Sequence, residues 1–250
     1  MIWPAIRGPT YVSSFLIFYD LFKVGQIEVI EIDVSNDASC IAAAESLRAR
    51  GVKLYALVNN AGMGLVKGGS EDMIINTNFM GPKRVTDALV DLIHQNEGRI
   101  INTSSGAASG WLKKQDATTK KLFTDPNLTF DELDQSVKKH FPNAKYNGSI
   151  YGLSKAALCA LTLVQAKLYP SLIVTSLSPG FIDTAMTKGY GAKLTPEQGC
   201  ISALKCLFGP VTSGHYYGSD GLRSPFTVSR DPGTPEYQGE EDPDASMYKK

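Results

Sequence analysis

Strand-like and helix-like segments alternate along most of this chain, and this order constrains the fold more than any other feature. Residues 27–32 alternate apolar and polar side chains, and residues 54–58 form a continuous apolar run, as expected for a strand covered on both faces. Further strands are predicted at 99–103 and 172–177, and helices at 38–50, 85–95, 153–169 and from Thr195 to about Phe208. Repeated strand–helix–strand order predicts an α/β fold with a doubly wound parallel sheet.

The composition excludes several classes of protein. Of the 250 residues, 43% are hydrophobic and 20% are charged, which permits a sizeable buried core and argues against disorder. Lys+Arg and Asp+Glu both number 25, so we expect no binding to nucleic acid or to an anionic membrane. No apolar run reaches the roughly 18 residues of a membrane span, so we expect a soluble, cytoplasmic protein. The four cysteines and three histidines are scattered, which predicts free thiols and no metal site.

The alternating pattern predicts one domain over residues 1–223. Residues 111–148 are mostly polar and separate a strand from a long helix, and a connection of this length is typical of a lid or binding loop. Within it, residues 129–132 (Thr-Phe-Asp-Glu) predict a capping box that begins a short helix ending near His140. Residues 224–250 contain four prolines and an acidic cluster at 240–242, which predicts a loosely held tail.

Polar or glycine-containing turns follow four of the predicted strands. Each turn alone has an ordinary explanation, because such residues favour the backbone conformations of turns. In a doubly wound sheet, however, ligands bind beyond the carboxyl ends of the strands, so four such turns predict a binding site on one edge. The turns are Asp33-Val34, Asn59-Asn60-Ala61-Gly62, Ser104-Ser105 and Ser178-Pro179-Gly180.

The sharpest local pattern is Tyr151 followed four residues later by Lys155. On a helix these positions share a face. An ammonium beside a phenol lowers the pKa of the phenol and makes it a better proton donor or acceptor near neutral pH. A serine hydroxyl from a neighbouring strand end would then bind a substrate carbonyl oxygen. The same pattern is also compatible with a buried tyrosine and a solvated lysine.

Together with Asn78, these motifs closely resemble the short-chain dehydrogenase/reductase family in order and approximate spacing, from about Ile27 to His215. The 46 positions between Ser105 and Tyr151 resemble the monomeric carbonyl-reductase branch, in which an insertion covers the active site and obstructs the usual dimer face. The resemblance implies a Rossmann-like fold, NADP as cofactor, a small-molecule carbonyl substrate and a monomer.

The resemblance also implies a role for each matching residue. Tyr151 would donate a proton to the carbonyl oxygen, Ser105 rather than Ser104 would hydrogen-bond that oxygen, and Lys155 would bind the nicotinamide ribose and lower the pKa of Tyr151. Asn78 would anchor a water relay behind Lys155. The implied cofactor contacts are Asp33 and Val34 at the adenine, Asn60 and Gly62 along the channel, and Pro179, Gly180, Ile182 and Thr184 at the nicotinamide carboxamide and phosphates.

The chain departs from the family pattern before Asp33. Family members begin with a strand, a TGxxxGxG turn and a helix that bind the pyrophosphate, whereas only Gly8 and Gly25 precede Asp33 here. One register places residues 1–7 at the family's second strand, with Arg7 as a contact for the 2′-phosphate or as an ordinary surface cation, and predicts a helix over 10–23. The strand missing from the centre of the sheet would be replaced by residues 1–18, or the sheet would be split.

Two functions are compatible with these observations. The first is an oxidoreductase that reduces a ketone or aldehyde with hydride from NADPH. The alternative is a catalytically impaired relative, or a truncated chain, that acts at most as a binding scaffold, because the phosphate-binding turn is absent from the sequence.

Overall fold

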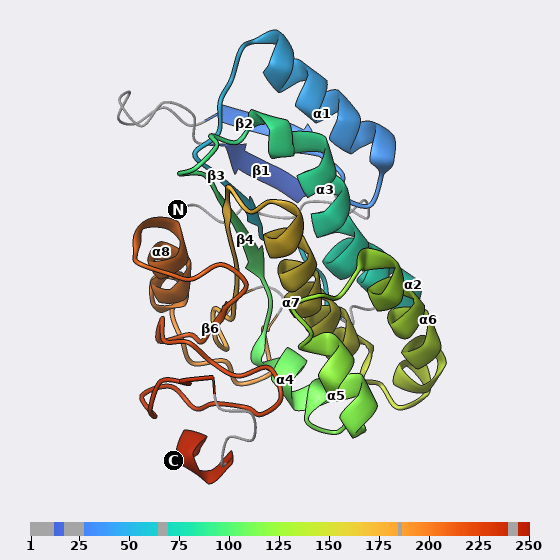
Figure 1. Cartoon of the computed structure of the whole chain (residues 1–250), viewed down its shortest axis with the longest axis vertical. Coiled ribbons are helices and arrows are strands. Elements are labelled where there is room, and N and C mark those ends of the chain that lie inside the picture. Colours follow the sequence, from blue (N-terminus) through green and yellow to red (C-terminus); the bar gives the residue numbers. More distant parts are fainter. Residues whose placement is uncertain (1–12, 18–27, 65–69, 185–186, 240–244) are drawn as a thin grey trace.

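The strands of this protein form two separate sheets (Figure 1). The computed structural model describes residues 13–17, 28–64, 70–184, 187–239 and 245–250. A four-stranded parallel sheet has the order β3 (Ala56–Asn59), β4 (Arg99–Thr103), β5 (Ile173–Leu177) and β6 (Tyr216–Tyr217), and an antiparallel pair is formed by β1 (Ser13–Ile17) and β2 (Glu28–Ile32). The prediction of an α/β fold with a parallel sheet is therefore confirmed.

The N-terminal region differs from the prediction. A helix is predicted over 10–23, but Ser13–Ile17 form strand β1, which pairs with β2 from Ser13 opposite Ile32 to Ile17 opposite Glu28. The helix prediction is wrong here because the backbone groups of β2 require a partner strand, and β1 provides it. Of the two alternatives for the sheet, the described residues show the split one. The strand predicted at 1–7, with Arg7, lies outside the described residues.

Helices cover both faces of the larger sheet. Helices α3 (Gly81–Leu89) and α7 (Ile150–Leu168) pack on one face, and α8 (Ile201–Phe208) packs on the other (Figure 1). Helix α1 (Asp37–Ala49) follows β2 and packs on β2 and α3. One apolar cluster therefore includes side chains from both sheets, among them Ile32, Ala44, Leu47, Leu57, Val85, Leu89 and Ile100.

Several helices begin or end away from the predicted positions. The helix predicted at 85–95 is preceded by α2 (Glu71–Ile75) and a π-helical turn (Asn76–Met80), and it ends in a 3-10 turn (Val90–Leu92). Thr195 and Gln198 make reciprocal hydrogen bonds at the predicted start of the last helix, but a 3-10 turn (Gln198–Cys200) comes before α8.

Residues 111–148 form a packed helical layer (Figure 1). Helix α4 (Gly106–Leu112) leads into α5 (Ala117–Phe123) and α6 (Phe130–Tyr146), and α6 packs along α7. The capping box of Thr129 and Glu132 is confirmed, but the helix continues past His140. It continues because its apolar face is buried against α4 and α7, with Phe123, Leu133 and Val137 in a common cluster with Trp111 and Leu153.

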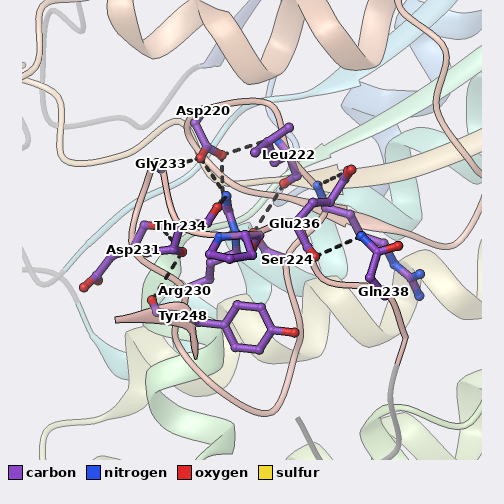
Figure 2. A network of polar contacts seen from close by, with 12 residues as sticks. Asp220, Leu222, Ser224, Arg230, Asp231, Gly233, Thr234, Glu236, Gln238 and Tyr248 are labelled. Atoms are coloured by element: carbon purple, nitrogen blue, oxygen red, sulfur yellow. Dashed lines mark hydrogen bonds and ion pairs between the residues drawn. The ribbon is translucent and has the colours of Figure 1, made fainter. Parts of the chain in front are cut away.

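The segment predicted as a loosely held tail makes specific polar contacts (Figure 2). Asp220 accepts two hydrogen bonds of 2.9 Å from the guanidinium of Arg230 and one of 2.8 Å from the backbone of Gly233. The side chain of Arg230 is only 1% exposed. Further along, Asp231 donates a backbone hydrogen bond to Tyr248 of a short 3-10 turn (Ala245–Tyr248). Composition does not reveal this anchor, because it depends on one buried charge pair.

All four cysteines are free thiols, as predicted. Among the described residues, no helix combines the length and hydropathy that a transmembrane span requires. In the same part of the chain, no cluster of His, Cys, Asp and Glu side chains has the makings of a metal site.

Candidate active site

Three of the predicted turns leave the larger sheet at the same level. Asn59 of β3 is aligned with Asn102 of β4, which is aligned with Ser176 of β5. The turns that follow these strands therefore begin side by side at the carboxyl edge of the sheet, where ligands bind in folds of this kind.

Buried side-chain amides join this edge to the helix behind it. Asn59 Nδ2 donates to Asn102 Oδ1 at 2.8 Å, and Asn102 Nδ2 donates to Gln165 Oε1 of α7 at 2.8 Å. Because buried amides are costly to leave without partners, this chain of bonds holds the ends of β3 and β4 against α7. The sequence offers no periodic signal for Asn102 or Gln165, since each partner comes from a different element.

A close helix crossing brings Ser105 to Tyr151. Helix α4 begins at Ser105, whose Oγ accepts the backbone N–H of Ala107, and it crosses α7 at Gly152. A Cβ atom at Gly152 would lie 2.9 Å from Cβ of Trp111 and 3.2 Å from the Ala107 oxygen. Glycine therefore permits a close approach of α4 to α7, which brings Ser105 near enough to Tyr151 to influence its pKa. The neighbouring Ser104 is buried and donates to the main-chain oxygen of Lys155, so Ser105 is the serine that faces Tyr151.

The structure corrects the predicted pKa of Tyr151. Burial raises this pKa above its usual value, and the hydrogen bond to Ser105 acts in the opposite direction. Lys155 does not lower it as predicted, because its ammonium lies 5.9 Å from the centre of the Tyr151 ring and donates to the Thr103 oxygen at 2.8 Å. The two side chains do share a helix face, as the spacing predicts.

Lys155 is a buried cation. Its residue surface is only 4% exposed, so the alternative of a solvated lysine is wrong. Burial lowers the pKa of Lys155 from 10.5 to about 8. The group therefore carries its charge at neutral pH and loses it in mildly alkaline solution.

Asn78 lies in the π-helical turn, where an extra residue interrupts the regular helix. Its Oδ1 accepts the backbone N–H of Met63 and its Nδ2 donates to the Met63 oxygen, both at 2.8 Å, and Nδ2 also donates to Ser154 Oγ at 3.0 Å. A Cβ atom at Gly62 would lie 3.2 Å from Asn78 Oδ1 and 3.3 Å from Lys155 Nζ. Gly62 therefore lies beside the side chains of both Asn78 and Lys155, and the bonds of Asn78 to Met63 hold the turn after β3. The water relay implied for Asn78 stays a prediction.

The remaining predicted cofactor contacts lie in ordered turns. Gly180 has a φ of +85°, a conformation that favours glycine, and Ile182 beyond it is buried. Thr184 donates its backbone N–H to Thr187 Oγ1 at 2.9 Å. Asn60 and Pro179 are half-buried in the turns after β3 and β5. Asp33 and Val34 lie in the loop after β2, a strand of the smaller sheet.

Comparisons with known proteins agree with this geometry. The family model for short chain dehydrogenases matches residues 21–116. The chain is also 29% identical to short-chain dehydrogenase/reductase 1 of Saponaria officinalis over 76% of either protein. The chain is thus similar to the short-chain dehydrogenase/reductase family. Another similar protein is carbonyl reductase [NADPH] 1 of Bos taurus, 26% identical over 68% of either chain. Among solved structures, salutaridine reductase from Papaver somniferum superposes on this chain with a TM-score of 0.63 and 26% identity, covering 74% of this chain and 80% of the other.

Proposed function

We propose that this chain reduces the carbonyl group of a ketone or aldehyde to an alcohol with hydride from NADPH. The observation that carries the proposal is the pairing of Ser105 and Tyr151 at the carboxyl edge of the sheet, next to the buried ammonium of Lys155. The names of two similar proteins, carbonyl reductase [NADPH] 1 and salutaridine reductase, support the same reaction class.

The residues at this edge suit the nicotinamide half of such a cofactor. Lys155 has three N–H donors, and one of them is used, by Thr103, among the contacts of the described residues. A buried ammonium with donors to spare fits the hydroxyl groups of a ribose. Gly62 adds a backbone surface without a side chain beside that ammonium. We assign no residues to the diphosphate, because the sequence before Asp33 contains no glycine-rich turn.

Ser105, Tyr151 and Lys155 would each have a separate role in the reduction of the carbonyl group. The bound cofactor supplies hydride to the carbonyl carbon. Ser105 would donate a hydrogen bond to the carbonyl oxygen and fix its position. Tyr151 would transfer its phenolic proton to that oxygen, and its raised pKa keeps the proton in place until then. Lys155, on the same helix face, would donate to the ribose hydroxyl groups and so hold the nicotinamide beside Tyr151.

The surroundings of the site support three narrower proposals. Helix α6 lies along α7, the helix of the family's usual dimer face, and this supports a monomer. Residues 1–223 are proposed as one domain, because side chains of both sheets share a core. Cytoplasmic location is proposed from the composition and the free thiols.

Replacement of Tyr151 by phenylalanine tests the reaction. Tyr151→Phe removes only the proton donor, so we expect kcat to fall by at least about a hundredfold while NADPH affinity is unchanged. Turnover is measured by the loss of NADPH absorbance with a panel of ketones and aldehydes, and affinity by cofactor fluorescence. Full turnover in the variant would refute the assignment of Tyr151.

The split sheet favours one alternative, a family member that binds ligands without catalysis. Titration with NADPH separates the two functions. Saturable binding at micromolar concentrations supports the reductase, and no binding at millimolar concentrations supports the scaffold.

A further inference from the structure

The loop after β2 is not placed by the pairing of strands in the larger sheet, because β2 pairs with β1. Residues 33–36 leave a strand that pairs with β1, whereas the other turns leave strands of the four-stranded ladder. Asp33 and Val34, the proposed adenine contacts, lie in this loop. Their position relative to the larger sheet must therefore depend on contacts with neighbouring helices.

Arg84 of α3 makes the most direct of these contacts. Its Nη1 donates to the Val34 oxygen at 2.6 Å, its Nη2 donates to Asn76 Oδ1 at 3.1 Å, and its Nε is paired with the Asp37 carboxylate. The side chain is 16% exposed. One guanidinium thus joins the loop, the first turn of α1 and the π-helical turn, because its planar fork presents several donors at once.

A second line of hydrogen bonds runs from Asn76 to Asp33. Asn76 Nδ2 donates to the Ser35 oxygen at 3.2 Å. Ser35 in turn donates to Asp33 Oδ1 through its backbone N–H at 2.9 Å and its hydroxyl at 2.6 Å. Arg84 therefore acts on Val34 directly and on Asp33 through Asn76 and Ser35.

The same helical segment also holds the other end of the proposed site. Asn76 begins the π-helical turn, and two residues later Asn78 holds the turn after β3 beside Lys155. At Gly81, a Cβ atom would lie 3.1 Å from Val34 Cγ2, so the helix packs directly on the loop. This segment links the adenine loop to the nicotinamide residues.

We propose that Arg84 is a positioning residue for the adenine half of NADPH. This inference rests on the proposed function. Among the described residues, the hydrogen bonds of Arg84 go to Val34, Asn76 and Asp37, and none goes to a residue proposed for the chemistry, so its loss acts first on the adenine end of the cofactor site. Binding of the adenine half weakens without it, and reactions that need only the nicotinamide half continue.

Two compounds, each corresponding to one half of NADPH, test whether Arg84 acts on the adenine half alone. Reduced nicotinamide mononucleotide lacks the adenine half, and adenosine 2′,5′-bisphosphate lacks the nicotinamide half. For Arg84→Met we expect the KM of NADPH and the Ki of adenosine 2′,5′-bisphosphate to rise about tenfold or more, because charge-assisted bonds that fix the loop are lost. We expect kcat at saturating NADPH, and kcat/KM with the mononucleotide, to stay within about twofold of the wild type. For Arg84→Lys we expect both constants to lie between those of the wild type and of Arg84→Met, since an ammonium keeps the charge but not the planar fork of donors.

Arg48 provides a matched control. It lies on α1 and joins it to the other end of α3, with 2.8 Å bonds to both Asp91 oxygens and a 2.6 Å bond to the Ala88 oxygen. Arg48→Met removes a comparable set of bonds between α1 and the α3 segment, away from the Asp33 loop, and should leave both cofactor constants unchanged.

Two results would overturn the inference alone. One is an equal loss with NADPH and with the mononucleotide in Arg84→Met, and the other is the same rise in the KM of NADPH in Arg48→Met. A wild-type chain that binds no NADPH would overturn the proposed function, and this inference with it.

Discussion

The two sheets among the described residues place the turns of the proposed site by different means. In the four-stranded sheet, backbone register sets the turns after β3, β4 and β5 side by side, and buried amides join them to α7. The loop after β2 lies outside that ladder and is held by side chains of the segment from Asn76 to Arg84. A site can therefore combine a part fixed by strand pairing with a part fixed by side-chain hydrogen bonds, and the two parts should respond differently to substitution.

The largest expected effect is on the buried amides of the four-stranded sheet. Asn102→Ala leaves Asn59 and Gln165 without their shared partner, so we expect the free energy of unfolding to fall by about 3–4 kcal/mol. Urea unfolding followed by circular dichroism measures the change. Asn143→Ala, at an exposed position on α6, serves as control and should be near neutral. A loss below about 1 kcal/mol for Asn102→Ala would contradict the role of these amides.

The helix crossing at Gly152 tests how closely Ser105 and Tyr151 must approach for the proposed reaction. Gly152→Ala forces α4 away from α7, so the contact between Ser105 and Tyr151 opens and kcat should fall about a hundredfold. Steady-state kinetics with a saturating ketone provides the measurement. At Gly110, on α4 at the other side of the crossing, a Cβ atom meets no atom within 4 Å, so Gly110→Ala should retain activity. Equal rates for both variants would show that the crossing does not position Ser105.

The lowered pKa of Lys155 predicts a pH dependence. The folded protein holds this proton less tightly than the unfolded chain, so burial of the charge destabilises the fold below about pH 8, and this cost disappears as the pH rises toward 10.5. Activity should change in the opposite direction. We expect kcat/KM to fall about tenfold per pH unit above about pH 8, as Lys155 loses the charge with which it is proposed to hold the ribose. A profile that stays flat to pH 10 would contradict the proposed role of Lys155.

The smallest effect is expected in the two-stranded sheet. Glu28 of β2 forms an ion pair with Arg50, and both side chains are about one-third exposed, at 34% and 36%. Solvent screens such a pair, so Glu28→Gln should change the free energy of unfolding by less than about 1 kcal/mol. Thermal unfolding checks this value. A loss as large as that of Asn102→Ala would remove the contrast between the two sheets.

Local patterns predicted the parts of the molecule that depend on near neighbours. Strand β4 has the predicted bounds, the capping box of Thr129 and Glu132 forms, and Tyr151 and Lys155 share a helix face. Each of these features depends on residues within a few positions of one another, which is the range over which helix and strand periodicity acts. The comparison with known proteins confirms the family that these motifs predict.

Contacts between distant segments determined the features of the fold and site that local patterns did not predict. Two of these features join different segments of the chain: the pairing of β1 with β2 and the hydrogen bond from Arg84 to Val34. Two others depend on burial by other elements: the raised pKa of Tyr151 and the lowered pKa of Lys155. Periodicity carries no information about such partners, because desolvation and strand pairing are set by what surrounds a residue in space. The sequence by itself determined which chemical groups are available and which share a helix face. The tertiary structure alone decided which of them are buried, what they bond to, and that the residues of the proposed site come from turns of two sheets.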